Sequence, residues 1–172
     1  MIVVKDTRKF VRDLLEEFGI TRPPVPVKRI AKKLGLLIAP IPANDEISGA
    51  LIRDGSRIII AVNSSHHINR QRFTIAHELG HYYMHGDMTE HVDQNLRVAW
   101  RNADSSKAVD WKEIAANRFA AELLMPTSYL RRDLDSLERI GKRTIALLAS
   151  KYGVSGEAMK IRLNNFGILG PF

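Results

Sequence analysis

Apolar residues recur with helical spacing at the start of the chain. Residues 7–18 place their apolar side chains on one face, and Gly19 follows as a helix terminator. A proline-rich link at 21–26 leads to a shorter pattern of the same kind at Val27–Leu34, which Gly35 ends. The pattern therefore predicts two helices joined by an extended link.

Three short apolar runs then favour β-strands, at Leu36–Ala39, Ser48–Arg53 and Arg57–Val62. The dipeptide Asp54-Gly55 separates the last two runs and is a strong signal for a hairpin turn. We expect a small antiparallel β-sheet of about three strands, packed on the helix that follows it in the chain.

Helical periodicity returns in two later segments. Ile68–Ala76 leads into the run His77–His81, with Asn69 as the expected N-cap. Gly80 lowers the helix propensity of this segment, so we interpret it as a point where another segment comes close. Residues 113–125 form the second helix, which a proline ends. The polar residues 86–108 between the two helices are expected to form a loop.

The last part of the chain predicts a helix at 144–152, a tight turn at 153–155 and a second helix at 156–163. We divide the chain into a main domain, residues 1–128, and a C-terminal helical, helix-turn-helix-like extension, residues 129–172, packed on it. This extension could complete the core, dock a partner protein or bind DNA. In the last case, Lys160 and Arg162 would contact phosphates or bases.

Composition narrows the class of protein. The chain has no cysteine, which excludes disulfides and thiolate metal sites. No apolar run is long enough to span a membrane, so we expect a cytoplasmic protein. The net charge of +7 divides into +5 for residues 1–35, −2 for 36–128 and +4 for 129–172. Basic ends can attract an acidic protein or nucleic acid, although such an excess also arises on ordinary solvated surfaces.

The run His77-Glu78-Leu79-Gly80-His81 carries the chemistry. Residues four apart on a helix lie about 40° from each other around its axis, so His77 and His81 can bind one metal ion. Glu78 lies about 100° further round, where its carboxylate can act on a water molecule as general base. This H-E-x-x-H pattern is typical of zinc hydrolases, and Zn²⁺ is the cofactor that it predicts.

A catalytic zinc site needs a third protein ligand. Asp87 has the spacing of one known arrangement, but that arrangement needs a glycine where this chain has Met84. His85 would crowd the next turn of the same helix. Glu113 is the strongest candidate, and Asn117, four residues later on the same face, could orient a ligating histidine.

One further hydrogen-bond donor is expected to hold the oxyanion that develops during hydrolysis. Tyr82, Tyr83 and His85 are the nearby candidates, and His85 could equally be structural.

Two segments together carry a family resemblance. Arg70–His81 and Asn117–Pro126 resemble the ImmA/IrrE family of bacterial and phage metallopeptidases, and three upstream segments, 23–27, 31–35 and 60–63, match the family's usual order. The resemblance runs from about residue 10 to about 130 and is weaker beyond. The resemblance implies a zincin-like α+β fold and a zinc-dependent, site-specific endopeptidase. Many relatives carry an acid where this chain has Ala115, which leaves Glu113 as the only carboxylate shortly before Asn117.

The resemblance also implies a partner, a helix-turn-helix transcriptional repressor that is cleaved and inactivated. Genes of this family typically lie beside the gene for their repressor, in mobile elements, stress responses or toxin–antitoxin-like pairs. A second hypothesis has the same partner but no peptide hydrolysis: the protein would be a non-catalytic anti-repressor that sequesters the repressor by binding it.

Overall fold

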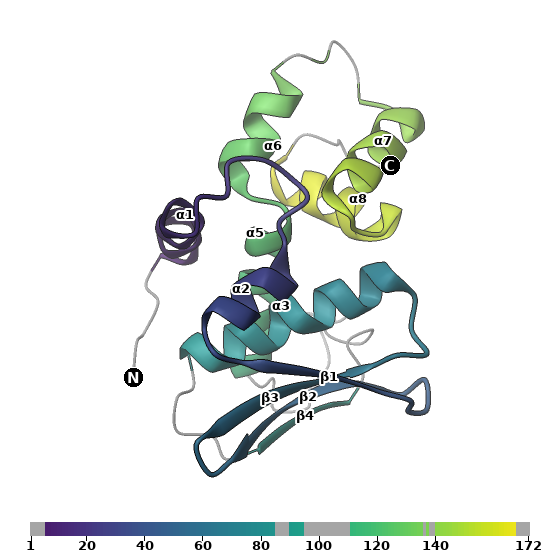
Figure 1. The fold of residues 1–172 in the computed structure, drawn as a ribbon. Helices are drawn as coiled ribbons and strands as arrows, with labels where there is room; N and C mark the ends of the chain where they lie inside the picture. The colour runs from purple at the N-terminus through teal and green to yellow at the C-terminus, as the bar shows by residue number, and fades with distance from the viewer. Residues whose placement is uncertain (1–5, 85–89, 95–110, 136, 138–139, 168–172) are drawn as a thin grey trace.

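The computed structural model describes residues 6–84, 90–94, 111–135, 137 and 140–167 (Figure 1). Within these residues, helices gather on one face of a four-stranded sheet, and the C-terminal helices lie farther from the sheet. The mixed α+β class predicted from the sequence is confirmed.

The two N-terminal helices form as their periodicity predicts. Helix α1 (Thr7–Glu17) begins at Asp6, whose carboxylate accepts hydrogen bonds from the backbone N–H groups of residues 8 and 9. Helix α2 (Val27–Lys33) ends before a glycine with φ of +77°. Each helix buries its apolar stripe: Val11, Leu14 and Leu15 on α1, and Val27, Ile30 and Ala31 on α2.

The sheet has the strand order β1-β3-β2-β4. Strands β2 (Ile47–Asp54) and β3 (Arg57–Asn63) form the predicted antiparallel hairpin, and Gly55 in its turn has φ of +58°. Strand β1 (Leu37–Ile41), however, pairs parallel with β3. The sheet is therefore mixed: the predicted antiparallel pairing is confirmed for β2 with β3, but β1 is parallel, and a fourth strand joins the three that were predicted.

The buried amide of Asn63 accounts for the position of β1. Its Nδ2 lies within hydrogen-bonding distance of the carbonyls of residues 43 and 44 in the β1–β2 link and of residue 47 at the start of β2, and its Oδ1 accepts from the N–H of Ala43. These bonds hold the link across the end of β3, so β1 and β2 lie on opposite sides of that strand. No local pattern in β1 could have indicated this arrangement.

Strand β4 (Glu90–Gln94) lies within the segment that was expected to be a loop. It pairs antiparallel with β2, with Val92 opposite Ala50. Polar residues dominate β4, so its sequence has no strand pattern, and its pairing to β2 through main-chain hydrogen bonds defines it. The rest of the expected loop at 86–108 lies outside the described residues.

The long helix α3 (Ile68–Met84) lies over the sheet, and α5 (Trp111–Leu124) crosses it (Figure 1). Gly80 lies at this crossing. A Cβ atom there would come within 3.1 Å of the Ala116 Cα and 3.3 Å of its carbonyl oxygen. The close approach predicted for Gly80 is thus confirmed, and its partner is the backbone of α5.

Asn69 does not cap α3 as expected. The helix begins one residue earlier, and the N–H of Asn69 donates to the ring Nδ1 of His67. The Asn69 side chain instead donates to the carbonyl of Val154, in the turn between α7 (Lys142–Tyr152) and α8 (Gly156–Asn165). Gly153 in this turn has φ of +65°.

The C-terminal helices are bonded to both α3 and α5. Arg72 of α3 donates to the carbonyls of Gly153 and Val25, at 3.0 Å each. Arg162 of α8 pairs with Glu122 of α5 and donates to the carbonyl of Met125. Glu122 is buried, and Arg162, which was expected to contact phosphates or bases if the extension bound DNA, makes internal contacts instead.

Helix α6 (Thr127–Leu134) was not predicted, because Pro126 was interpreted only as the end of α5. The proline precedes the first turn of α6, where its lack of an N–H costs nothing. The Glu122 carboxylate accepts hydrogen bonds from the N–H and the hydroxyl of Thr127, the first residue of α6.

Across the described residues, no helix has both the length and the apolar character that crossing a bilayer requires.

Replacing Gly80 by valine should separate α3 from α5. We expect Gly80→Val to lower the free energy of unfolding by about 1–3 kcal/mol, since the new side chain would overlap the backbone of Ala116. Urea unfolding measures this change. Gly156→Val is the matched control, because a Cβ there has no neighbour within 4 Å. Equal losses in both variants would contradict the close approach.

Candidate metal centre

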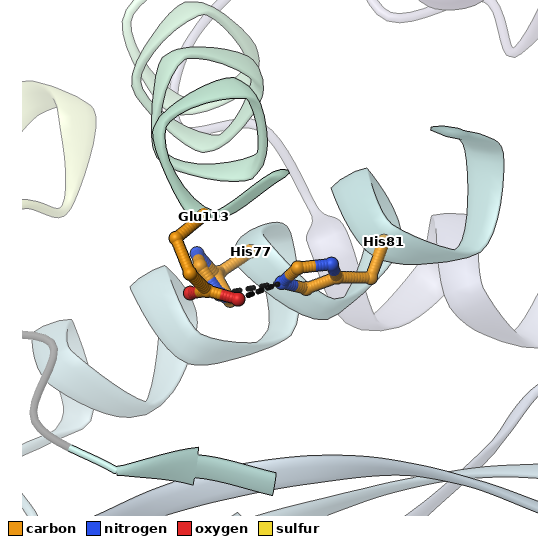
Figure 2. Close-up of side chains that lie close together, drawn as sticks. All are labelled: His77, His81 and Glu113. Carbon is orange, nitrogen blue, oxygen red and sulfur yellow. Dashed lines mark hydrogen bonds and ion pairs between the residues drawn. The ribbon is translucent and has the colours of Figure 1, made fainter. Parts of the chain in front are cut away.

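Three side chains predicted as metal ligands come together where α3 and α5 cross. His77 and His81 project from successive turns of α3, and Glu113 reaches them from the first turn of α5 (Figure 2). The Nε2 atoms of the two histidines are 2.9 Å apart. The Glu113 carboxylate oxygens lie 3.2 Å from each Nε2. Residues 36 positions apart in sequence thus form one cluster.

The donor set fits a divalent metal ion. All three donor groups lie within 4.8 Å of one another and could hold one ion. Ligand atoms about 2.0–2.1 Å from a tetrahedral zinc are roughly 3.3 Å apart, close to the separations found here. Two imidazoles and one carboxylate leave a fourth position for water or substrate, as catalytic sites require.

Asn117 sets the orientation of His77. Its side-chain oxygen lies 2.9 Å from the His77 Nδ1. An amide oxygen can only accept, so Nδ1 carries the proton and Nε2 presents its lone pair towards Glu113. The ring of Phe73, one turn earlier, stacks beside the His77 ring with a centroid distance of 6.5 Å. These contacts hold the imidazole in a ligand-ready tautomer and position.

The centre is closed on the α3 side. His77, His81 and Glu78 are each 0% exposed, whereas the Glu113 side chain is 27% exposed. Access from solvent is therefore on the Glu113 side. Charges in such a buried setting interact more strongly than they would in water, because the local dielectric is low.

Three residues were candidates for the donor to the oxyanion, and the structure describes two of them, Tyr82 and Tyr83. The Tyr83 ring packs against Phe10 of α1 and Phe119 of α5, in the hydrophobic core. Burial raises the pKa of its hydroxyl. Tyr82 is half-buried and has an edge contact with the Tyr83 ring. His85, like the weaker ligand candidate Asp87, lies outside the described residues.

A buried histidine also lies in the connection between β3 and α3, where no functional residue was predicted. His66 is buried, and its Nε2 lies 3.1 Å from the carboxylate of Asp45. Arg70 of α3 contacts the same carboxylate, also at 3.1 Å, and the hydroxyl of Ser48. This cluster ties the β1–β2 link to α3. Because only the fold brings Asp45 and Arg70 to His66, no local sequence pattern could have predicted that this histidine is buried.

A mixed sheet, a helix bearing His-Glu-x-x-His and a third candidate ligand on a second helix are the features expected of a metallopeptidase of this motif class. The sequence profile described as the IrrE N-terminal-like domain matches residues 31–164. The match covers most of the chain, which therefore belongs to this peptidase family.

Two curated relatives carry metallopeptidase names. The radiation response metalloprotease IrrE of Deinococcus radiodurans is 32% identical over 107 residues, which cover 61% of this chain and 30% of that protein. The metallopeptidase ImmA of Bacillus subtilis is 28% identical over 102 residues, 59% of this chain and 55% of that protein. The matched region thus spans about half or less of each relative.

A solved structure supports the fold. A transcriptional regulator of Mycobacterium tuberculosis superposes with a TM-score of 0.64 over 93% of this chain and 47% of that chain. Its sequence identity is 17%, so the likeness concerns the fold alone.

Removing the Asn117 oxygen should weaken metal binding. We expect Asn117→Ala to lower zinc affinity about 10–100-fold, because the His77 ring loses the acceptor that sets its tautomer. Competition with a chromophoric chelator measures the affinity. Asn117→Asp retains an acceptor and should bind zinc far more tightly than the alanine variant. Equal affinity in the two variants would show that the hydrogen bond does not orient the ring.

Stability should depend on pH through His66. Burial lowers the pKa of His66 below its ordinary 6.5, and Arg70 lowers it further, while Asp45 opposes the shift. The unfolded chain therefore takes up this proton at a higher pH than the folded chain, so stability falls as the pH drops below about 6.5.

Urea unfolding at pH 7.5 and 5.5 tests this dependence. The loss of stability on acidification should be smaller in His66→Gln than in the wild type. Arg57→Gln, at an exposed position on β3, should behave like the wild type. If acidification destabilised all three proteins equally, burial of a neutral His66 would not be the cause.

Proposed function

We propose that this protein is a zinc-dependent, site-specific endopeptidase. The observation that carries the proposal is the convergence of His77, His81 and Glu113, with Glu78 buried beside them on α3. Membership of the IrrE N-terminal-like peptidase family and the names of the two curated relatives support the same activity.

In this proposal, His77, His81 and Glu113 hold the zinc ion. Once bound, zinc would act as a Lewis acid towards a peptide carbonyl and make water nucleophilic at neutral pH. The Glu78 carboxylate accepts the proton of the attacking water and then delivers it to the leaving amine nitrogen. Asn117 keeps the His77 ring in place throughout.

The proposed substrate is a helix-turn-helix transcriptional repressor, whose cleavage would relieve repression. The resemblance to the ImmA/IrrE family supports this substrate. The chemistry of the site is compatible with any accessible peptide bond, so selection of one bond has to come from contacts with the folded partner rather than from the metal centre.

The first test uses the purified protein, zinc and the repressor encoded beside its gene. Intact-mass analysis should find one discrete cut with the wild type. Glu78→Gln should retain zinc and bind the repressor, yet leave it uncut, because an amide cannot accept the proton of the attacking water. Zinc removal by a chelator should stop cleavage, and zinc addition should restore it.

If the protein is instead a non-catalytic anti-repressor, the wild type and Glu78→Gln should each form a stable complex with the uncut repressor. That result, together with equal relief of repression by the two proteins in a reporter assay, would exclude the peptidase mechanism. Asn117→Ala is a useful companion variant, since it should weaken zinc binding while leaving Glu78 in place.

A further inference from the structure

A hollow of about 230 Å³ lies between α1 and α6, at the end of α5 that is opposite Glu113. Its lining brings four cationic side chains together from distant parts of the sequence: Arg8, Lys9 and Arg12 of α1, and Arg131 of α6. The hydroxyl of Ser128 also lines it. The two basic ends of the chain thus meet in space, which their separate charge counts did not reveal.

We propose that this hollow binds a small polyvalent oxyanion, of the phosphate or diphosphate class. Guanidinium groups present paired N–H donors that match the oxygens of phosphate. Among the described residues, the side chains of Arg8 and Arg131 have neither an ion-pair partner nor a hydrogen bond. Both guanidinium groups are exposed and available to a ligand.

Within the described part of the chain, the other two cations share one counter-charge. Lys9 lies 3.0 Å and Arg12 3.1 Å from the carboxylate of Asp13. These contacts lower the pKa of Asp13, with the Lys9 hydrogen bond as the largest cause. Because one carboxylate cannot neutralise two cations, this side of the hollow stays positive.

The acidic groups at the hollow are already engaged. The Asp6 carboxylate accepts from two backbone N–H groups at the start of α1. Glu122 on the floor accepts from Thr127 and forms its buried ion pair with Arg162. Their hydrogen bonds and the Arg162 charge offset the repulsion that either carboxylate would exert on an anion.

The arrangement favours a small anion over an extended nucleic acid. The four cations line one hollow from two helices instead of following a groove, and a volume of about 230 Å³ suits a phosphate-bearing compound. Glu113 and Glu122 are nine residues apart on α5, so roughly 13 Å of helix separates this hollow from the metal centre. The hollow is therefore a second, distinct site.

Thermal shift and calorimetry with inorganic diphosphate on the zinc-loaded protein test the proposal. Ionic strength is held constant with sodium chloride. The wild type should show saturable binding, and Arg8→Gln/Arg131→Gln should weaken it by more than about tenfold, because two charged donors are lost. Arg57→Gln/Arg143→Gln removes the same charge from exposed positions elsewhere and should leave the affinity unchanged.

Three results would overturn the proposal. One is the absence of saturable binding at millimolar diphosphate. Another is equal affinity in both double variants, which would place the anion elsewhere, for example on the zinc ion. The third is tight binding of a short DNA duplex that diphosphate does not displace, which would make the surface a nucleic-acid contact. Peptidase activity is not needed for any of these measurements, so they are independent of the proposed function.

Discussion

The crossing of α3 and α5 at Gly80 is the constraint on which the metal centre depends. The absence of a side chain at Gly80 lets the backbone of Ala116 come into direct contact with α3. Ala116 lies between Glu113 and Asn117, so this single contact brings both side chains to the same histidine. A wider helix separation would withdraw the carboxylate and the orienting amide together, because both belong to one rigid turn of α5.

Burial of polar and charged groups has to be offset by pairing. At the candidate metal centre, the His77 ring is hydrogen-bonded to Asn117, and a bound cation would offset the charge of Glu113 beside the two imidazoles. Farther out, Arg72 donates to the turn after α7, and Arg162 pairs with Glu122. The C-terminal helices are thereby attached to both helices that carry the candidate ligands. Their packing supports the crossing from outside and gives the extension a structural role in the fold.

Helix α5 carries carboxylates with different partners at its two ends. Glu113 at the start meets two histidines at the metal centre, whereas Glu122 near the end is held by Arg162 and Thr127 beneath the basic hollow. The fold thus separates the two sites along one helix. Three cations of the basic N-terminal segment and one, Arg131, of the C-terminal segment line the second, proposed site, whereas the candidate metal ligands all belong to the mildly acidic central segment.

Features that depend on neighbours within a few residues could be predicted from the amino-acid sequence. These are the helices with clear periodicity, the Asp54-Gly55 hairpin and the spacing of His77, Glu78 and His81 on one helix, because backbone preference and helix geometry act locally. The sequence also indicated Glu113 as the third candidate metal ligand, because it shares a helix face with Asn117. Four features could not be predicted and became visible in the folded chain: the parallel pairing of β1, the strand β4, the burial of His66 and Glu122, and the proximity of cations from the two basic ends. Each of these depends on a partner far away in the chain, and no local pattern records where that partner will lie.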